Sequence, residues 1–124
     1  MAAPNVVNVT TITAKTAYLT PTNTTANVLL ANPASSNKVF KINTIMVVNV
    51  DGTNSMFTTV SINTAAAGSG TSFPIASTIT IPANASLVVS DKSSAFYLEE
   101  DKSIIVTSST SSKLTYIISY EEIS

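Results

Sequence analysis

The chain lacks four residue types that carry much of protein chemistry. Its 124 residues include no cysteine, no histidine, no tryptophan and no arginine. Without cysteine there is no disulfide and no thiolate metal site, and the redox compartment stays undetermined. Without histidine the commonest general acid and base is missing, so Ser-His-Asp and Cys-His sites are excluded.

Charged residues are also scarce. They make up 10% of the chain, whereas an ordinary soluble domain has about 25%. Serine, threonine and asparagine must therefore cover the surface, and such a surface can be buried against a neighbour without desolvating many ions. The net charge is −1 and the six lysines are scattered, while nucleic-acid binding needs clustered basic residues. The composition favours packing into a larger assembly and argues against a nucleic-acid partner.

Long apolar runs are missing as well. No run approaches the roughly 18 residues of a membrane span, so no membrane partner is expected. Met1–Asn5 has neither the basic nor the apolar region of a secretion signal. At this length we expect a single domain, residues 1–124, with a hydrophobic core large enough to be stable without a disulfide or a bound metal. Pro4 and the polar start predict an extended N-terminal arm over about residues 1–9.

The sequence does contain a β pattern, centred on Val39–Val50, the longest strand-like run. Its apolar residues recur with a period of two, which predicts one buried and one mixed face. The residues on the predicted buried face are Phe40, Ile42, Met46, Val48 and Val50. Asp51-Gly52 is a strong hairpin signal, because both residues tolerate the positive φ of a tight turn. Met56–Asn63 is therefore predicted to be the hairpin partner.

The rest of the chain continues this pattern of short strands and turns. About eight strands are expected, with no helical periodicity between them. Leu114–Tyr120 alternates, and Pro74 places the start of Phe73–Ile81 at a sheet edge or a bulge. Ala65–Ser72 holds two of the three glycines and predicts a mobile loop. The predicted fold is an all-β antiparallel sandwich, either jelly-roll-like or immunoglobulin-like.

The seven carboxylates offer little catalytic chemistry. They fall in predicted turns or at the C-terminus, as Asp51, Asp91, Glu99, Glu100, Asp101, Glu121 and Glu122. Neither Asp51–Asn54 nor Glu99–Asp101 has the spacing of a calcium loop. An enzyme such as a glycosidase would need two of these carboxylates to converge in a cleft. We expect no enzyme, no cofactor and no metal site.

Three aromatic residues leave one alternative open. Tyr18, Phe96 and Tyr97 would form a sugar-binding platform if they were exposed together. In the simpler arrangement, Phe96 or Tyr97 closes the end of the sandwich and the other stays at the surface. The second arrangement is favoured, since aromatic side chains are usually at least partly buried.

A likeness to a known class of proteins is carried by four parts of the chain. These are Met1–Thr13 (MAAPNVVNVTTIT), the pair SNKVFKIN and VNVDGTN within 36–54, Tyr97–Val106 (YLEEDKSIIV) and Ser119–Ser124 (SYEEIS). As a set they resemble small virion structural proteins of tailed phages, especially phages that infect marine cyanobacteria. In that family-like pattern the turn reads Leu-Glu-Glu-Gly-Asp, whereas this chain has Asp101-Lys102.

The resemblance implies a non-enzymatic building block of the phage particle. The first expectation is a capsid decoration, or cement, protein that binds the major capsid protein and stabilises contacts between capsomers. It would act as a homo-oligomer such as a trimer. The alternative is a neck, tail or fibre component, including a carbohydrate- or receptor-binding module. The expected location is the virion, with the head surface first.

Contacts with neighbours are expected at arms and edges, because edge strands offer unpaired backbone groups. The β-rich, charge-poor arm Ala2–Val9 is the first candidate, and the loop Ala65–Ser72, which could order on contact, is the second. The predicted contact residues are Ala2, Pro4, Asn5, Val6, Val7, Val9, Ala66, Gly68 and Gly70.

Overall fold

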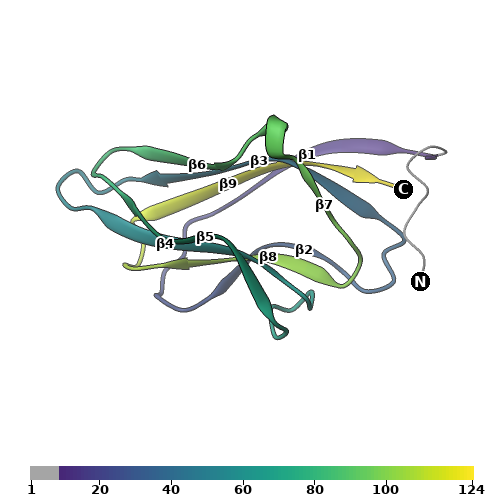
Figure 1. Ribbon diagram of the computed structural model, residues 1–124, viewed down its shortest axis with the longest axis horizontal. Helices are drawn as coiled ribbons and strands as arrows, with labels where there is room; N and C mark the ends of the chain where they lie inside the picture. The colour runs from purple at the N-terminus through teal and green to yellow at the C-terminus, as the bar shows by residue number, and fades with distance from the viewer. Residues whose placement is uncertain (1–8) are drawn as a thin grey trace.

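The computed structural model describes residues 9–124 as two antiparallel sheets packed face to face (Figure 1). Sheet A has the strand order β1-β9-β3-β6, with β7 also paired to β3, and sheet B has the order β2-β8-β4-β5. The elements are β1 (Ile12–Leu19), β2 (Asn27–Asn32), β3 (Val39–Asn49), β4 (Met56–Asn63), β5 (Ser72–Ile81), β6 (Ser86–Ser90), the 3-10 turn η1 (Lys92–Ser94), β7 (Phe96–Leu98), β8 (Lys102–Ser108) and β9 (Leu114–Ile123). The predicted all-β antiparallel sandwich is confirmed.

The core lies between the inner faces of the two sheets. Its most deeply buried apolar side chains are Ile42, Ile45, Val47, Val60, Ile81, Leu98, Ile104, Val106, Leu114, Tyr116 and Ile118. The Tyr116 hydroxyl lies 2.6 Å from Thr58 Oγ1 and 3.0 Å from Ser108 Oγ, and it donates to the Thr107 carbonyl at 3.2 Å. These bonds join sheet A to sheet B and satisfy a hydroxyl whose burial would otherwise be costly.

A β-bulge at Asn43 changes which face of β3 is buried. Ile42 pairs with Tyr120 of β9, but Thr44 pairs with Ser119, so Asn43 is an extra residue. An extra residue inverts the in-out alternation that follows it. The β3 residues that face the core are Phe40, Ile42, Ile45 and Val47. The prediction of the buried face is therefore correct for the part of β3 before the bulge. It is wrong for the part after the bulge. The residues turned outward are Met46, Val48 and Val50.

The predicted hairpin between Val39–Val50 and Met56–Asn63 is not formed. β3 lies in sheet A and β4 in sheet B, so the chain crosses from one sheet to the other. Asn49 directs this crossing, because its buried Nδ2 donates to the carbonyls of Asn54 and Ile81, both at 2.9 Å. The turn is where the sequence predicts it, but Asn49 ties it across the sandwich.

β5 is an edge strand of sheet B, as Pro74 predicts. Its register against β4 shifts between Thr58 and Val60 and again between Val60 and Ser61. Thr78 on β5 has a φ of 50°, a left-handed conformation that β-branched residues rarely adopt. A proline and irregular register both discourage pairing with a further strand.

The turn between β7 and β8 also contains a left-handed residue. Asp101 has a φ of 58° at the position where the resemblance would place glycine. Aspartate is one of the few residues that visit this conformation readily, because its short side chain can bond locally. The turn therefore keeps a conformation that glycine favours, and the strand that follows begins at Lys102.

Candidate functional site

The predicted N-terminal contact arm falls mostly outside the described residues. The arm residues within 1–8 are Ala2, Pro4, Asn5, Val6 and Val7. Their contacts stay a prediction. Val9 is half-buried, and the N–H groups of Thr10 and Thr11 donate to the Ser124 carbonyl at 2.6 and 3.0 Å. The chain therefore enters β1 beside its own C-terminal residue.

The predicted contact loop, 65–72, is tied to sheet B by hydrogen bonds. Asn63 Oδ1 accepts from the N–H groups of Ala65 and Gly70, each at 2.9 Å. Ser103 Oγ donates to the Ala65 carbonyl at 2.8 Å. A buried asparagine that bonds both ends of a loop holds it in one conformation. These bonds argue against the predicted mobile loop.

The middle of the same loop lies on the outer face of sheet B. Gly68 has a φ of 79°, and a Cβ added there would lie 3.3 Å from the side chains of Val28 and Ile105. Ala66 and Gly68 are half-buried, and Gly70 is exposed. Of the three predicted contact residues in the loop, only Gly70 is exposed, and its N–H and C=O groups are both bonded to Asn63.

Two of the turn carboxylates bond their own turns. Asp51 Oδ1 accepts from the N–H groups of Thr53 and Asn54, which lowers the pKa of this carboxyl. The Ser93 hydroxyl, and then the Ser93 N–H, lower the pKa of Asp91 in the same way. Over residues 9–124, no group of three or more acidic, histidine or cysteine residues gathers as a metal site would need. No helix in this part of the chain is long and apolar enough to cross a membrane.

One charge cluster lies beside a hollow of about 510 Å³ that Phe40 and Tyr120 help to line. Glu122 forms ion pairs with Lys15 at 3.2 Å and with Lys38 at 3.1 Å. Burial alone raises the pKa of Glu122, but the hydrogen bonds and charges of the two lysines outweigh it, so the pKa is lowered. The cluster joins β1 and the β2–β3 connection to β9.

The three aromatic residues of the alternative sugar platform are not brought together. Phe96 packs against the core, whereas Tyr97 is 52% exposed and Tyr18 is 77% exposed. Tyr18 lies on β1 and Tyr97 on β7, with β9 and β3 between them in sheet A. Phe96 therefore closes the core while Tyr97 stays at the surface. The platform built on these residues is not formed.

β1 presents a regular free edge of sheet A. Among the described strands it pairs with β9 alone, without a register shift from Ile12 to Leu19. Thr11 and Ser124 exchange both backbone hydrogen bonds, and in an antiparallel pair such bonded positions alternate with unbonded ones. The residues whose backbone N–H and C=O groups point away from β9 are therefore Ile12, Ala14, Thr16 and Tyr18.

Apart from Lys15, none of the features that usually protect an edge interrupts β1. It contains no proline, no glycine and no bulge. Its one charged residue, Lys15, is opposite Tyr120 and binds Glu122, so the charge is turned to the inner face. The β2 edge of sheet B, by contrast, shifts register between Val28 and Leu30. Among the described strands, β1 is thus the most regular edge open to another strand.

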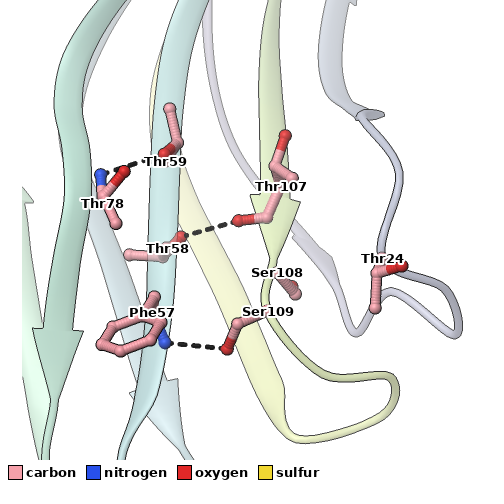
Figure 2. Close-up of a pocket in the computed structure, with 8 residues that line it drawn as sticks. All are labelled: Thr24, Phe57, Thr58, Thr59, Thr78, Thr107, Ser108 and Ser109. Atoms are coloured by element: carbon pink, nitrogen blue, oxygen red, sulfur yellow. Dashed lines mark hydrogen bonds between the residues drawn. The ribbon is translucent and has the colours of Figure 1, made fainter.

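A pocket of about 270 Å³ lies over one end of sheet B (Figure 2). The residues that line it are Thr24, Phe57, Thr58, Thr59, Thr78, Thr107, Ser108 and Ser109. All of them except Phe57 carry a hydroxyl group, and none carries a charge. They come from β4, β5, β8 and two connections, so no local motif in the sequence signals the pocket, and the sequence analysis missed it.

Comparison with known proteins identifies a similar fold but no family. No family model matches the chain, and no curated protein matches it. Among solved structures, the chain is similar to one described as "Bacillus endospore appendages form a novel family of disulfide-linked pili". The TM-score is 0.51 at 15% identity, over 92% of this chain and 88% of that chain. At this identity the likeness concerns the fold alone.

Proposed function

We propose that the protein is a non-enzymatic structural subunit of a tailed-phage virion, and first of all a capsid decoration protein. It would bind the major capsid protein on the outer head and stabilise contacts between capsomers, as a homo-oligomer such as a trimer. The resemblance of four parts of the sequence and the charge-poor surface support this role. The alternative position is the neck, tail or a fibre.

The observation that carries the proposal is the free edge of β1. A row of unpaired backbone donors and acceptors is a template for a strand of another chain. The outer face behind this edge is uncharged along the cross-strand row Tyr18–Ile117–Met46–Val88, which spans β1, β9, β3 and β6. A strand added to β1 would extend this apolar row as well as the hydrogen-bond ladder.

The similar fold adds support of a general kind. The similar solved structure is described as belonging to pili, which are assemblies of subunits. This type of sandwich therefore occurs in a structural polymer. Those pili are described as disulfide-linked, whereas the present chain has no cysteine. Assembly by this chain would therefore depend on non-covalent contacts such as strand pairing.

The edge is tested by placing proline at an outward-pointing N–H group. Thr16→Pro removes a donor from the free edge but no bond to β9, because the Thr16 N–H points away from β9. We expect Thr16→Pro to bind at least about tenfold more weakly to capsids assembled without this protein. Thr16→Ala keeps the N–H group and should bind like the natural chain.

Circular dichroism and thermal unfolding establish that both variants are folded before binding is compared. Equal binding by folded Thr16→Pro and Thr16→Ala would show that β1 is not the contact edge. Failure of the natural chain to bind capsids, tails or fibres would contradict the virion proposal as a whole.

A further inference from the structure

We propose that the pocket at Phe57 binds one neutral sugar ring of a glycan. The pocket lies on sheet B, whereas the β1 edge belongs to sheet A. The sugar site and the assembly edge are thus separate surfaces, and either proposal can fail without the other.

Phe57 supplies the stacking surface. Its side chain is 49% exposed, and its backbone is held by bonds to Ser109, with the Phe57 N–H donating to Ser109 Oγ at 2.9 Å. The face of an aromatic ring carries partial negative charge. The C–H groups on one face of a pyranose carry partial positive charge, so the two faces attract while both lose contact with water.

The hydroxyl groups around the ring supply polar partners. Thr59 Oγ1 accepts from the Thr78 N–H at 3.0 Å, and no acceptor within residues 9–124 takes the Thr59 O–H, so it can donate to a ligand. Over the described part of the chain, the side-chain hydroxyls of Thr24 and Thr107 make no hydrogen bond to protein, although the Thr107 carbonyl is occupied by Tyr116. Sugar hydroxyls both donate and accept, so they match such groups without requiring a charge.

The pocket wall at Thr78 is fixed in an unusual conformation. Thr78 has a φ of 50°, and its N–H is turned onto Thr59 Oγ1 rather than into a strand ladder. Left-handed conformations of β-branched residues are costly and tend to occur at binding sites that the surrounding structure holds rigid. A rigid wall lowers the entropy lost when a ligand binds.

The lining also decides which ligands do not fit. It has no lysine to pair with a phosphate or carboxylate, so nucleotides and acidic sugars would be desolvated without compensation. A volume of about 270 Å³ is just below the range of sites for drug-sized ligands. One ring of a neutral hexose or N-acetylhexosamine is the matching size. A single ring should bind with a Kd on the order of 1 mM.

The test is saturation-transfer NMR with the methyl glycosides of glucose, galactose, mannose and N-acetylglucosamine. At least one glycoside should show transfer and should shift the backbone amide signals of Phe57, Thr59 and Thr107. Phe57→Ala should weaken this binding by at least about tenfold. Thr107→Val, which replaces the hydroxyl with a methyl of similar size, should weaken it by about three- to tenfold.

Tyr97→Ala is the matched control, because Tyr97 is 52% exposed and lies on the other sheet. It should bind the glycoside like the natural chain. Equal binding by Phe57→Ala and Tyr97→Ala, or no transfer to any glycoside at about 50 mM, would overturn the assignment. Phe57 is a surface residue, so its truncation should leave the fold intact, and amide spectra confirm this in the same experiment.

Discussion

At the scale of single residues, buried asparagines connect the strands of this charge-poor chain. Asn32, Asn49 and Asn63 are each at most 1% exposed and lie at or near strand ends. Asn32 Nδ2 donates to the carbonyls of Lys38 and Leu98 at 2.9 and 3.0 Å. Asn32 and Asn49 thereby satisfy the buried carbonyls of Leu98 and Ile81, and a buried carbonyl left without a donor costs more than an average hydrogen bond contributes.

Asn49→Ala should therefore destabilise the protein by about 3 kcal/mol, because the carbonyls of Asn54 and Ile81 lose their donor. Asn54→Ala removes an exposed amide side chain that bonds the carboxyl of Asp51 in the same turn, and it should cost about 0.5 kcal/mol or less. Urea unfolding midpoints measure both effects. Similar midpoints for the two variants would show that Asn49 does not hold the crossing between the sheets.

Among residues 9–124, Glu100 is the one with buried side-chain oxygens that accept no hydrogen bond. Both of its carboxylate oxygens are shielded from solvent, and no hydrogen-bond donor among the residues described here reaches them. Glu100→Gln removes this uncompensated charge and should raise stability by about 1 kcal/mol. The neighbouring Glu99 is exposed, so Glu99→Gln should leave the melting temperature unchanged. A lower melting temperature for Glu100→Gln would indicate that the carboxylate has a partner in solution.

At the scale of elements, the bulge at Asn43 explains why the core-facing residues of β3 have even numbers before it and odd numbers after it. Without Asn43, the pairs Ile42–Tyr120 and Thr44–Ser119 would follow each other in a regular ladder. Ile45 and Val47 would still face inward. The bulge residue is therefore dispensable for burial, although its side chain donates to Glu121 at 3.1 Å.

Deletion of Asn43 should accordingly give a folded protein that is less stable by about 1 kcal/mol, the contribution of the lost hydrogen bond. Deletion of Ile117 is the matched control, because β9 is regular there and the shift would turn Ser119 and Glu121 into the core. The second variant should not fold. The dispersion of amide NMR signals decides between these outcomes, and folding of both variants would contradict the register argument.

The Lys15–Glu122–Lys38 cluster ties three elements together in a pH-dependent way. Because the pKa of Glu122 is lowered in the fold, its contribution is present above the ordinary carboxyl pKa. It is lost as the pH falls through the lowered value. Glu122→Gln should cost about 1 kcal/mol at neutral pH, since both lysines are more than a third exposed and solvent weakens the pairs.

In acid, the natural chain and Glu122→Gln should converge in stability as Glu122 becomes protonated. Unfolding curves measured from neutral to acid pH test this directly. A gap between the two proteins that stays constant over the whole pH range would show that the ion pairs contribute nothing.

At the scale of the whole molecule, periodicity and turn residues predicted the structural features that neighbouring residues determine. They located the strands near Val39–Val50, Met56–Asn63, Phe73–Ile81 and Leu114–Tyr120 and the sheet edge at Pro74, because each follows from neighbouring residues. They failed at the Asn43 bulge and at the expected β3–β4 hairpin, since register and sheet membership depend on strands far along the chain. The Phe57 pocket was missed for the same reason: its lining is assembled from segments that the sequence separates.

The proposed role also belongs to this scale. Few charges, a regular β1 edge and the apolar outer row Tyr18–Ile117–Met46–Val88 suit a protein that packs against copies of itself or a capsid subunit. Contacts of this kind should respond weakly to salt, because they contain little charge to screen. A weak dependence of binding on salt concentration would distinguish strand pairing from an association driven by charges.

The central claim is tested most directly by the copy number of this protein in purified virions. Quantitative mass spectrometry measures it against the major capsid protein of the same particles. A decoration protein is predicted at one copy per capsid subunit or at a simple fraction of that number. A few copies per particle would favour the neck, tail or fibre alternative, and absence from the particle would contradict the structural role itself.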